Sequence, residues 1–418
     1  MSYISRAVDT LLIDDLSIMG GVLIEGARGC GKTETGIFHT RSHFRVDQAN
    51  NRRLAELNPP SVLAGETPRL IDEWQLAPVL WNEIRYEIDT RRQPGQFILS
   101  GSATPADSIT RHTGAGRFSR LRMRPMTLGE THPHPHRITL SDLRQITNVP
   151  SLPEALSYIE LATEAVRGGW PALISSQSKS FARFVRNYIT NIAHTDLPQL
   201  GTQFEPVRVQ RLLRSIARNI ATEASAVTLS KDISADGGTL SPASVRTYLD
   251  ALTKIFILEE LPPWSGSLRS KSRLRKQAKL HFCDPSLACA ALKTSPEALA
   301  NNPDYFGQVF ESMAVRDIRT YAEQIGASCF GYRDESGLEV DIIIEFDDGH
   351  WAGIEVKLGE SDSVITMAQK NLLRLRDDRM LNEPDFLAIV TGGTSGFTLP
   401  TGIHVLPLSV MGALNIAK

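Results

Sequence analysis

The chain has 418 residues, of which 41% are hydrophobic and 22% charged, and its formal net charge at pH 7 is -2. This length predicts two or three domains, and the near-zero charge excludes a uniformly basic surface for nucleic acid. Any basic surface must therefore be local. The four cysteines form no C-x-x-C pair, so neither a zinc cluster nor a disulfide framework is expected.

The N-terminus and the hydropathy of the chain bear on its location. Asp9, Asp14 and Asp15 interrupt the first apolar stretch, which excludes a signal peptide. No run approaches the roughly 18 apolar residues that a membrane span needs. We therefore expect a cytoplasmic protein that has no membrane partner.

Residues 1–150 alternate short apolar strands with helical patterns, which predicts a mostly parallel sheet covered by helices. A helix is expected from Lys32 and another over Val79–Thr90. The expected strands are Gly21–Gly26, His43–Val46, Arg69–Trp74 and Gln96–Gly101.

Residues 151–265 read mostly as helices. One helix is expected over Thr239–Glu260, with Ser241 and Pro242 as its N-cap and first-turn residue. A shorter helical segment, Leu229–Ala235, precedes it, and the stretch IFILEELPPW (Ile255–Trp264) looks extended. Two short helices followed by an extended stretch predict a winged helix-turn-helix.

Residues 266–418 form a third predicted domain of α/β type. A helix is expected over Phe306–Ala322. Two strands, Glu339–Phe346 and Trp351–Leu358, are separated by the turn residues Asp347–Gly349 and predict a hairpin.

A Walker A motif, GARGCGKT, spans Gly26–Thr33 between the first expected strand and helix. Backbone N–H groups of such a loop turn inward around phosphate oxygens, and the helix that follows presents its positive end. Lys32 is expected to reach the β- and γ-phosphates of ATP, and the Thr33 hydroxyl to bind Mg²⁺. The nucleotide-binding residues are thus Gly26, Ala27, Arg28, Gly29, Cys30, Gly31, Lys32 and Thr33.

A Walker B pattern, RLIDE (Arg69–Glu73), supports the same site. Asp72 is expected to hold Mg²⁺ through water, and Glu73 to polarise the attacking water. A strand that ends in a solvated acidic turn is the alternative. The two motifs in order favour a site that binds ATP and Mg²⁺.

Four further residues are candidates for catalysis. Ser100 and Ser102 end the strand QFILSGS, where they either contact the γ-phosphate or water or simply begin a turn. Arg117 and Arg120 either stabilise charge in the transition state, in cis or across the interface of a homo-oligomer, or are ordinary solvated arginines.

Several motifs together resemble those of the bacterial and archaeal AAA-type ATPases that carry a C-terminal domain of unknown function. They are GARGCGKT, IDEWQ (Ile71–Gln75), FILSGSATP (Phe97–Pro105), GAGRFSRLRMRPMTLGE (Gly114–Glu130), GGWP (Gly168–Pro171), DPSLA (Asp284–Ala288) and FGQVFES (Phe306–Ser312). The resemblance covers almost the whole chain. It implies an AAA-like ATPase core, a helical middle and a C-terminal fold like that of restriction endonucleases, and it leaves the biological role open.

A second site is suggested in the third predicted domain. Asp341 lies on one expected strand, and Glu355 and Lys357 share a face of the next, which resembles the D…E-x-K core of PD-(D/E)XK nucleases. Carboxylates would hold Mg²⁺ there, Lys357 would position water, and Glu311 could supply a third carboxylate. The alternative is a hairpin with ordinary Glu–Lys pairs.

Three local features favour DNA as a partner, although solvated surface is the alternative for each. The expected recognition helix carries Arg246 and Lys254, with Asp250 between them. The helical stripe is Arg208, Arg211, Arg214 and Arg218, and the linker strip is Arg269, Lys271, Arg273, Arg275, Lys276 and Lys279. The sequence thus predicts an ATPase coupled to DNA, with an ATP-gated nuclease and a nucleotide-dependent protein-interaction switch as alternatives.

Overall fold

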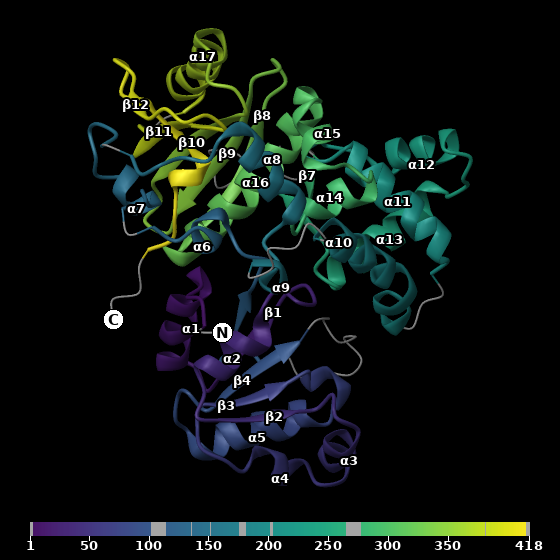
Figure 1. Ribbon diagram of the computed structural model, residues 1–418. Helices are drawn as coiled ribbons and strands as arrows, with labels where there is room; N and C mark the ends of the chain where they lie inside the picture. Colours follow the sequence, from purple (N-terminus) through teal and green to yellow (C-terminus); the bar gives the residue numbers. More distant parts are fainter. Residues whose placement is uncertain are drawn as a thin grey trace. The chain divides into compact units, whose positions relative to one another are not determined.

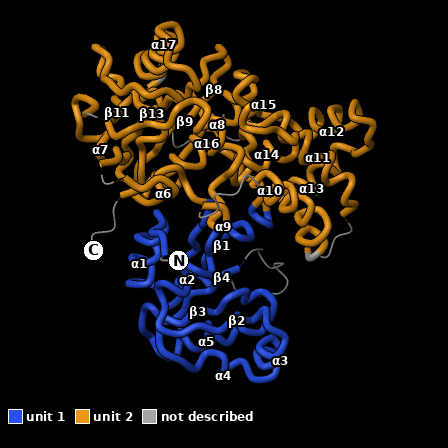
Figure 2. The backbone as a smooth tube through the Cα atoms, viewed as in Figure 1, with its two compact units in different colours: residues 1–125, 254–256, 415–418 blue, residues 126–253, 257–414 orange. Residues whose placement is uncertain are grey.

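The computed structural model describes residues 3–101, 114–134, 136–150, 152–174, 181–200, 204–264, 277–380 and 382–414. The chain forms two compact units (Figure 2). Unit 1 comprises Met1–Pro125 and two short later segments, and unit 2 comprises Met126–Thr253 and Ile257–Leu414. The division into domains 1–150, 151–265 and 266–418 stays a prediction.

Unit 1 contains a five-stranded parallel sheet with the order β2-β3-β4-β1-β5 (Figure 1). The parallel sheet expected from the sequence is therefore confirmed. β4 lies between β1 and β3, so three strand ends that are distant in the chain meet at one edge. The strands are β1 (Gly21–Glu25), β2 (Ser42–Arg45), β3 (Arg69–Asp72), β4 (Phe97–Gly101) and β5 (Phe118–Arg122).

Helices cover both faces of this sheet, which explains why its central strands are apolar throughout. Alternate residues of one strand enter different cores: Val22 and Ile24 pack with α1, whereas Leu23 packs with α4 and α5. The helices are α1 (Ala7–Ile18), α2 (Lys32–Phe38), α3 (Ala49–Leu57), α4 (Pro59–Leu63) and α5 (Leu80–Arg91).

The helical part of unit 2 differs from the sequence prediction at one helix end. The expected helix over Thr239–Glu260 is observed as α13 (Pro242–Lys254), with Ser241 Oγ accepting a hydrogen bond from Ser244 N. Phe256 has a φ of 63°, which an α-helix cannot contain, so the helix ends before it. The chain then forms β6 (Leu258–Leu261), which pairs antiparallel with β7 (Lys279–Phe282).

Most other helices of unit 2 are short. They are α6 (Leu128–Thr131), α7 (Leu140–Leu143), α8 (Tyr158–Arg167), α9 (Pro171–Ile174), α10 (Phe181–Asn191), α11 (Pro206–Arg218), α12 (Ala226–Ala235), α14 (Ser286–Ala291) and α15 (Pro296–Ala300). Among the described residues, every helix is too short or too polar to cross a membrane.

The rest of unit 2 is a six-stranded mixed sheet with the order β12-β13-β11-β10-β9-β8. The expected hairpin is present as an antiparallel pair of β9 and β10, and β11 continues the sheet parallel to β10. Two long helices, α16 (Pro303–Gln324) and α17 (Asp362–Arg379), accompany the sheet. The strands are β8 (Ala327–Arg333), β9 (Glu339–Phe346), β10 (Trp351–Lys357), β11 (Phe386–Thr391), β12 (Phe397–Thr398) and β13 (His404–Pro407).

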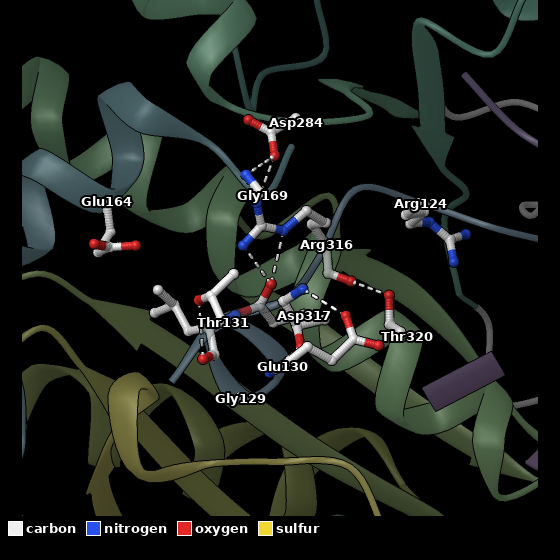
Figure 3. A network of polar contacts seen from close by, with 12 residues as sticks. Arg124, Gly129, Glu130, Thr131, Glu164, Gly169, Asp284, Arg316, Asp317 and Thr320 are labelled. Carbon is white, nitrogen blue, oxygen red and sulfur yellow. Dashed lines mark hydrogen bonds and ion pairs between the residues drawn. The ribbon is translucent and has the colours of Figure 1, made fainter. Parts of the chain in front are cut away.

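A buried polar network connects several segments of unit 2 (Figure 3). The Arg316 guanidinium of α16 lies between the carboxylates of Asp284 and Asp317, 2.7 Å from each. Asp284 also accepts a hydrogen bond from Gly169 N at 2.9 Å, and Asp317 accepts one from Leu128 N at 2.9 Å. One buried cation thus balances two buried anions, and backbone N–H groups donate to the same two carboxylates.

Candidate functional site

The candidate nucleotide site lies at the carboxyl ends of three adjacent strands of unit 1. β1 ends at Glu25 and continues into the Walker A loop, while β3 ends at Asp72. β4 pairs with both, placing Ser100 opposite Ile24 on one side and opposite Asp72 on the other. In open α/β sheets, ligands bind outside the carboxyl ends of the strands.

The Walker A loop has a shape that requires glycine at two positions. Gly31, which precedes α2, has a φ of 111°, a backbone conformation that side chains disfavour. A Cβ atom at Gly26 would lie 2.0 Å from the carbonyl oxygen of Met123. Arg28 and Gly29 form the exposed tip of the loop, whereas Ala27 and Cys30 are buried beneath it.

Lys32 lies inside this loop with its side chain buried. Its Nζ donates hydrogen bonds to the carbonyl oxygens of Gly26 and Ala27, at 2.8 and 2.9 Å. The loop is therefore wrapped around an ammonium group. Neutral carbonyl acceptors bind an ammonium more weakly than charged phosphate oxygens do, so the arrangement fits a phosphate ligand.

Asp72 gathers the groups that fit a magnesium ion. Thr33 Oγ1 lies 3.0 Å from Asp72 Oδ1 and 3.2 Å from Oδ2, and Ser100 Oγ donates a very short hydrogen bond to Oδ1. Thr33 is the hydroxyl and Asp72 the carboxylate that the sequence predicts, and oxygen donors of this kind are those that Mg²⁺ prefers. Two predicted ligands and Ser100 thus meet at one place.

Glu73 follows Asp72 with a left-handed backbone, since its φ is 54°. The expected strand Arg69–Trp74 therefore ends two residues early, at Asp72. Glu73 Oε2 accepts a hydrogen bond from Gln75 Nε2 at 2.5 Å. Glu73 is thus the first residue after β3, and it precedes the 3-10 turn Trp74–Leu76.

Arg117 lies at the edge of the sheet opposite to the one where the Walker A loop begins. Phe118, the first residue of β5, is in register with Gly21, whereas the Walker A loop begins after Glu25. Four residues of strand separate these edges by roughly 13 Å. The Arg117 guanidinium pairs with Asp89 instead, at 2.7 Å, and this hydrogen bond raises the Arg117 pKa. A role for Arg117 in the transition state, in cis or across a subunit interface, stays a prediction.

Two catalytic candidates remain, Arg120 and Ser102. Arg120 pairs with Glu25, the residue before the Walker A loop, at 2.8 Å. Ser102 lies outside the described residues.

Sequence patterns missed two residues of this site. The buried Arg6 side chain donates to the carbonyl oxygens of Cys30 and Arg124, at 2.9 and 2.8 Å, so it supports the Walker A loop from below. Gln75 binds Glu73. Neither residue is part of a Walker motif. The only sequence signal for Gln75 is its place in the run IDEWQ.

The candidate acids of unit 2 also gather in one place, together with two lysines. Asp341 Oδ2 accepts hydrogen bonds from Val356 N at 2.8 Å and from Lys357 Nζ at 3.0 Å. Lys357 also pairs with Glu355, at 2.5 Å. Lys279 Nζ lies 2.8 Å from Glu311 Oε1, 2.6 Å from Glu339 Oε1 and 3.7 Å from Asp341 Oδ1.

The acids of this cluster differ in how readily they ionise. Burial raises the pKa of Glu355 to about 8 and that of Glu311 to about 7, and the Asp341 charge adds to both shifts. Burial also opposes ionisation of Asp341, but Lys357, Lys279 and the Val356 N–H outweigh it and lower the Asp341 pKa. Asp341 is thus the permanent anion of the cluster.

The ammonium groups of Lys279 and Lys357 both pair with carboxylates of this cluster. Within the described part of the chain, no three His, Cys, Asp or Glu side chains lie close enough to hold a metal ion. Lys279 was expected in a strip of basic residues that contact phosphates. It is 7% exposed and surrounded by carboxylates, so that prediction is wrong.

The other basic residues that were expected to contact DNA lie on α11 and in the linker. Three arginines of the α11 stripe have acidic partners: Arg208 pairs with Glu205, Arg214 with Asp236 and Arg218 with Asp232, at 2.6, 3.5 and 2.8 Å. The linker residues Arg269, Lys271, Arg273, Arg275 and Lys276 lie outside the described residues.

Comparisons with known proteins match three successive regions of the chain. Residues 20–132 match the family model of an AAA domain. Residues 159–298 match a domain of unknown function (DUF8612), and residues 306–411 match another (DUF4143).

Relatives that span most of the chain are themselves uncharacterized. Proteins of Mycobacterium tuberculosis and Mycobacterium bovis are each 25% identical over 398 residues, which is 92% of this chain and 79% of theirs. Among solved structures, the Walker-type ATPase of Pyrococcus abyssi is similar with a TM-score of 0.40 and 11% identity, over 69% of this chain and 96% of that chain. The N-terminal region is thus a P-loop ATPase-like domain, and two domains of unknown function follow it.

Proposed function

We propose that this protein binds ATP together with Mg²⁺ at the Gly26–Thr33 loop and hydrolyses it. The observation that carries the proposal is the meeting of Thr33 and Asp72, 3.0 Å apart, beside a loop that encloses the Lys32 ammonium. The match of residues 20–132 to an AAA domain supports it.

Each residue has a distinct task in this reaction. Lys32 exchanges its carbonyl partners for phosphate oxygens, and the loop N–H groups bind the same phosphates. Thr33 would hold Mg²⁺ directly and Asp72 would hold it through water, and the ion would neutralise charge on the phosphates. Glu73 orients the attacking water and accepts its proton.

Two substitutions test the assignment. Lys32→Ala should weaken ATP binding and lower turnover at least about 100-fold, because the cation at the phosphates is lost. Glu73→Gln should leave ATP bound while turnover falls about 100-fold or more, because only activation of water is removed. The measurements are nucleotide affinity by calorimetry and steady-state phosphate release.

The matched controls are Arg53→Ala and Glu66→Gln, two exposed positions of unit 1, and both should behave as the wild type. Turnover at the wild-type rate in Lys32→Ala would remove the site assignment. An equal loss of affinity in Glu73→Gln would make Glu73 structural.

We further propose that the ATP cycle acts on DNA through unit 2. The order of α12, α13 and the β6–β7 ribbon supports a winged helix-turn-helix, and the exposed Arg246 of α13 supports a DNA-facing surface. The pairing of the α11 arginines with acids weakens that helix as a phosphate contact.

ATPase rates with and without single-stranded, duplex and branched DNA separate the candidates. Stimulation by DNA supports the proposal, whereas no response to any form favours a nucleotide-dependent protein-interaction switch. Manganese-dependent cleavage that Asp341→Asn abolishes would favour the nuclease, in which a divalent ion replaces the lysine contacts of Asp341. Concentration-dependent turnover would indicate a homo-oligomer, in which Arg117 could act on a neighbouring copy.

A further inference from the structure

Gln75 lies directly behind the glutamate to which we assign activation of water. It belongs to the short 3-10 turn Trp74–Leu76 that follows β3, and its Nε2 donates to Glu73 Oε2. A carboxylate only accepts hydrogen bonds, so the NH₂ group of the amide must face Glu73. The carbonyl oxygen of the same amide therefore points away from Glu73.

The surroundings of that oxygen show what sets the orientation of the amide. Gln75 Oε1 is buried and accepts no hydrogen bond from the described residues. It lies against the end of β4, where a Cβ atom at Gly101 would come within 2.8 Å of it. Because a buried acceptor without a partner is unfavourable, the hydrogen bond to Glu73 is what determines the orientation of the amide.

The turn that carries Gln75 is itself firmly anchored. The adjacent Trp74 is 1% exposed and stacks on Trp81 of α5, with ring centroids 5.1 Å apart. Trp74 and Trp81 both belong to the core between the sheet and α5. The Gln75 amide therefore extends toward Glu73 from a fixed backbone.

We propose that Gln75 is a positioning residue, which fixes the direction of the Glu73 carboxylate toward the attacking water. The inference rests on the proposed ATPase function. Glu73 has a long side chain on a turn with left-handed backbone, and the hydrogen bond from Gln75 limits the rotational freedom of its carboxylate. A hydrogen bond from a rigid turn removes that freedom before the reaction begins, which is how positioning lowers a barrier.

Gln75→Met tests this role, because methionine has a similar length and no hydrogen-bond donor. We expect kcat for ATP to fall about 10- to 100-fold, the range for losing a hydrogen bond to a charged group. KM, the calorimetric affinity for ATP and the thermal midpoint should match the wild type, because within the described residues the Gln75 side chain hydrogen-bonds to Glu73 alone. Gln93→Met at an exposed position is the control and should leave kcat unchanged.

A double variant separates positioning from general structural support. If Gln75 acts through Glu73, then Gln75→Met should cost nothing further in a Glu73→Gln background, since the group to be positioned is already inactive. Losses that multiply in the double variant, or a wild-type kcat in Gln75→Met, would overturn the proposal. If Gln75→Met does not fold, Gln75→Asn gives the same test, because its amide is one methylene too short to reach Glu73.

The failure of this inference differs from the failure of the proposed function. A wild-type protein that releases no phosphate contradicts the ATPase function and the role of Gln75 with it. Wild-type turnover that depends on Lys32 and Glu73 but not on Gln75 contradicts the role of Gln75 alone.

Discussion

Asp72 accepts hydrogen bonds from the hydroxyl groups of Thr33 and Ser100, and the Arg45 guanidinium lies 3.8 Å away. These partners come from α2, β4 and β2, so a single carboxylate connects three neighbouring elements of unit 1. Thr33 has the larger consequence among them, because its hydroxyl is also an expected ligand of Mg²⁺.

Thr33→Val removes this hydroxyl while it retains the shape of the side chain. We expect the Mg²⁺ concentration at half-maximal ATPase activity to rise about tenfold or more, which corresponds to about 1.4 kcal/mol. Thr33→Ser keeps the hydroxyl and should remain close to the wild type. The measurement is a Mg²⁺ titration of turnover at fixed ATP, and equal midpoints for Val and Ser would exclude Thr33 as a ligand.

At the residue scale, what could be predicted depended on spacing along the chain. Lys32, Thr33 and Asp72 were predictable because their geometry follows from a loop and a strand of fixed register. Ser100 was predictable as a candidate because it ends a neighbouring strand. Gln75 and Arg6 were not, because their roles depend on turn geometry and on side chains that meet across the fold.

Among the elements, α13 shows the limit of helical periodicity. Val245, Tyr248 and Leu252 form the buried face that their spacing predicts. Phe256 continues the same spacing and is buried as well, yet its φ of 63° places it beyond the helix. Periodicity records which residues are buried and cannot detect that the backbone has turned.

The strand β7 contains a histidine with a clear consequence for stability. His281 is 3% exposed, and its Nδ1 lies 3.2 Å from Ser312 Oγ. Burial, together with the charges of Arg319 and Lys279, lowers its pKa to about 3, and the Glu259 charge opposes this shift. His281 is therefore neutral in the folded protein at pH values where the unfolded chain binds a proton.

The sign of the resulting pH dependence follows from this difference. The contribution of neutral His281 to the free energy of unfolding is complete above pH 6.5 and declines as the pH falls from 6.5 toward 3. The free energy of unfolding is measured by urea unfolding for the wild type and for His281→Asn. Between pH 7.5 and 5.5 the wild type should lose about 1.4 kcal/mol relative to the variant. A difference independent of pH would contradict the buried neutral state.

On the scale of the whole molecule, the network around Arg316 predicts a large loss of stability. Arg316→Met leaves the buried Asp284 and Asp317 without their cation, which should destabilise unit 2 by about 3–5 kcal/mol. Chemical unfolding followed by circular dichroism measures the loss. Arg374→Met removes an exposed pair with Asp378 and should cost at most about 1 kcal/mol. Equal costs would contradict the importance of burial.

Features of the fold that depend on short stretches of sequence were predictable, whereas those that depend on contacts between distant residues were not. The parallel sheet of unit 1 and the β9–β10 hairpin follow from apolar runs and turns within short windows. The position of Lys279 does not, because its partners Glu311 and Glu339 are distant in sequence. Its neighbours in the chain are basic, and they predicted a linker strip that contacts phosphates instead.

The Arg316 network also bears on how the sequence of this chain can diverge. Leu128, Gly169 and Arg316 lie in three regions that match three different families. Leu128 N donates to Asp317, Gly169 N donates to Asp284, and Arg316 pairs with both aspartates. Exchanging one region for that of a relative would bring a foreign loop or helix to a buried charge that tolerates little displacement. We therefore expect the three regions to diverge together, and chimaeras to fold only when all partners of Asp284 and Asp317 come from one parent.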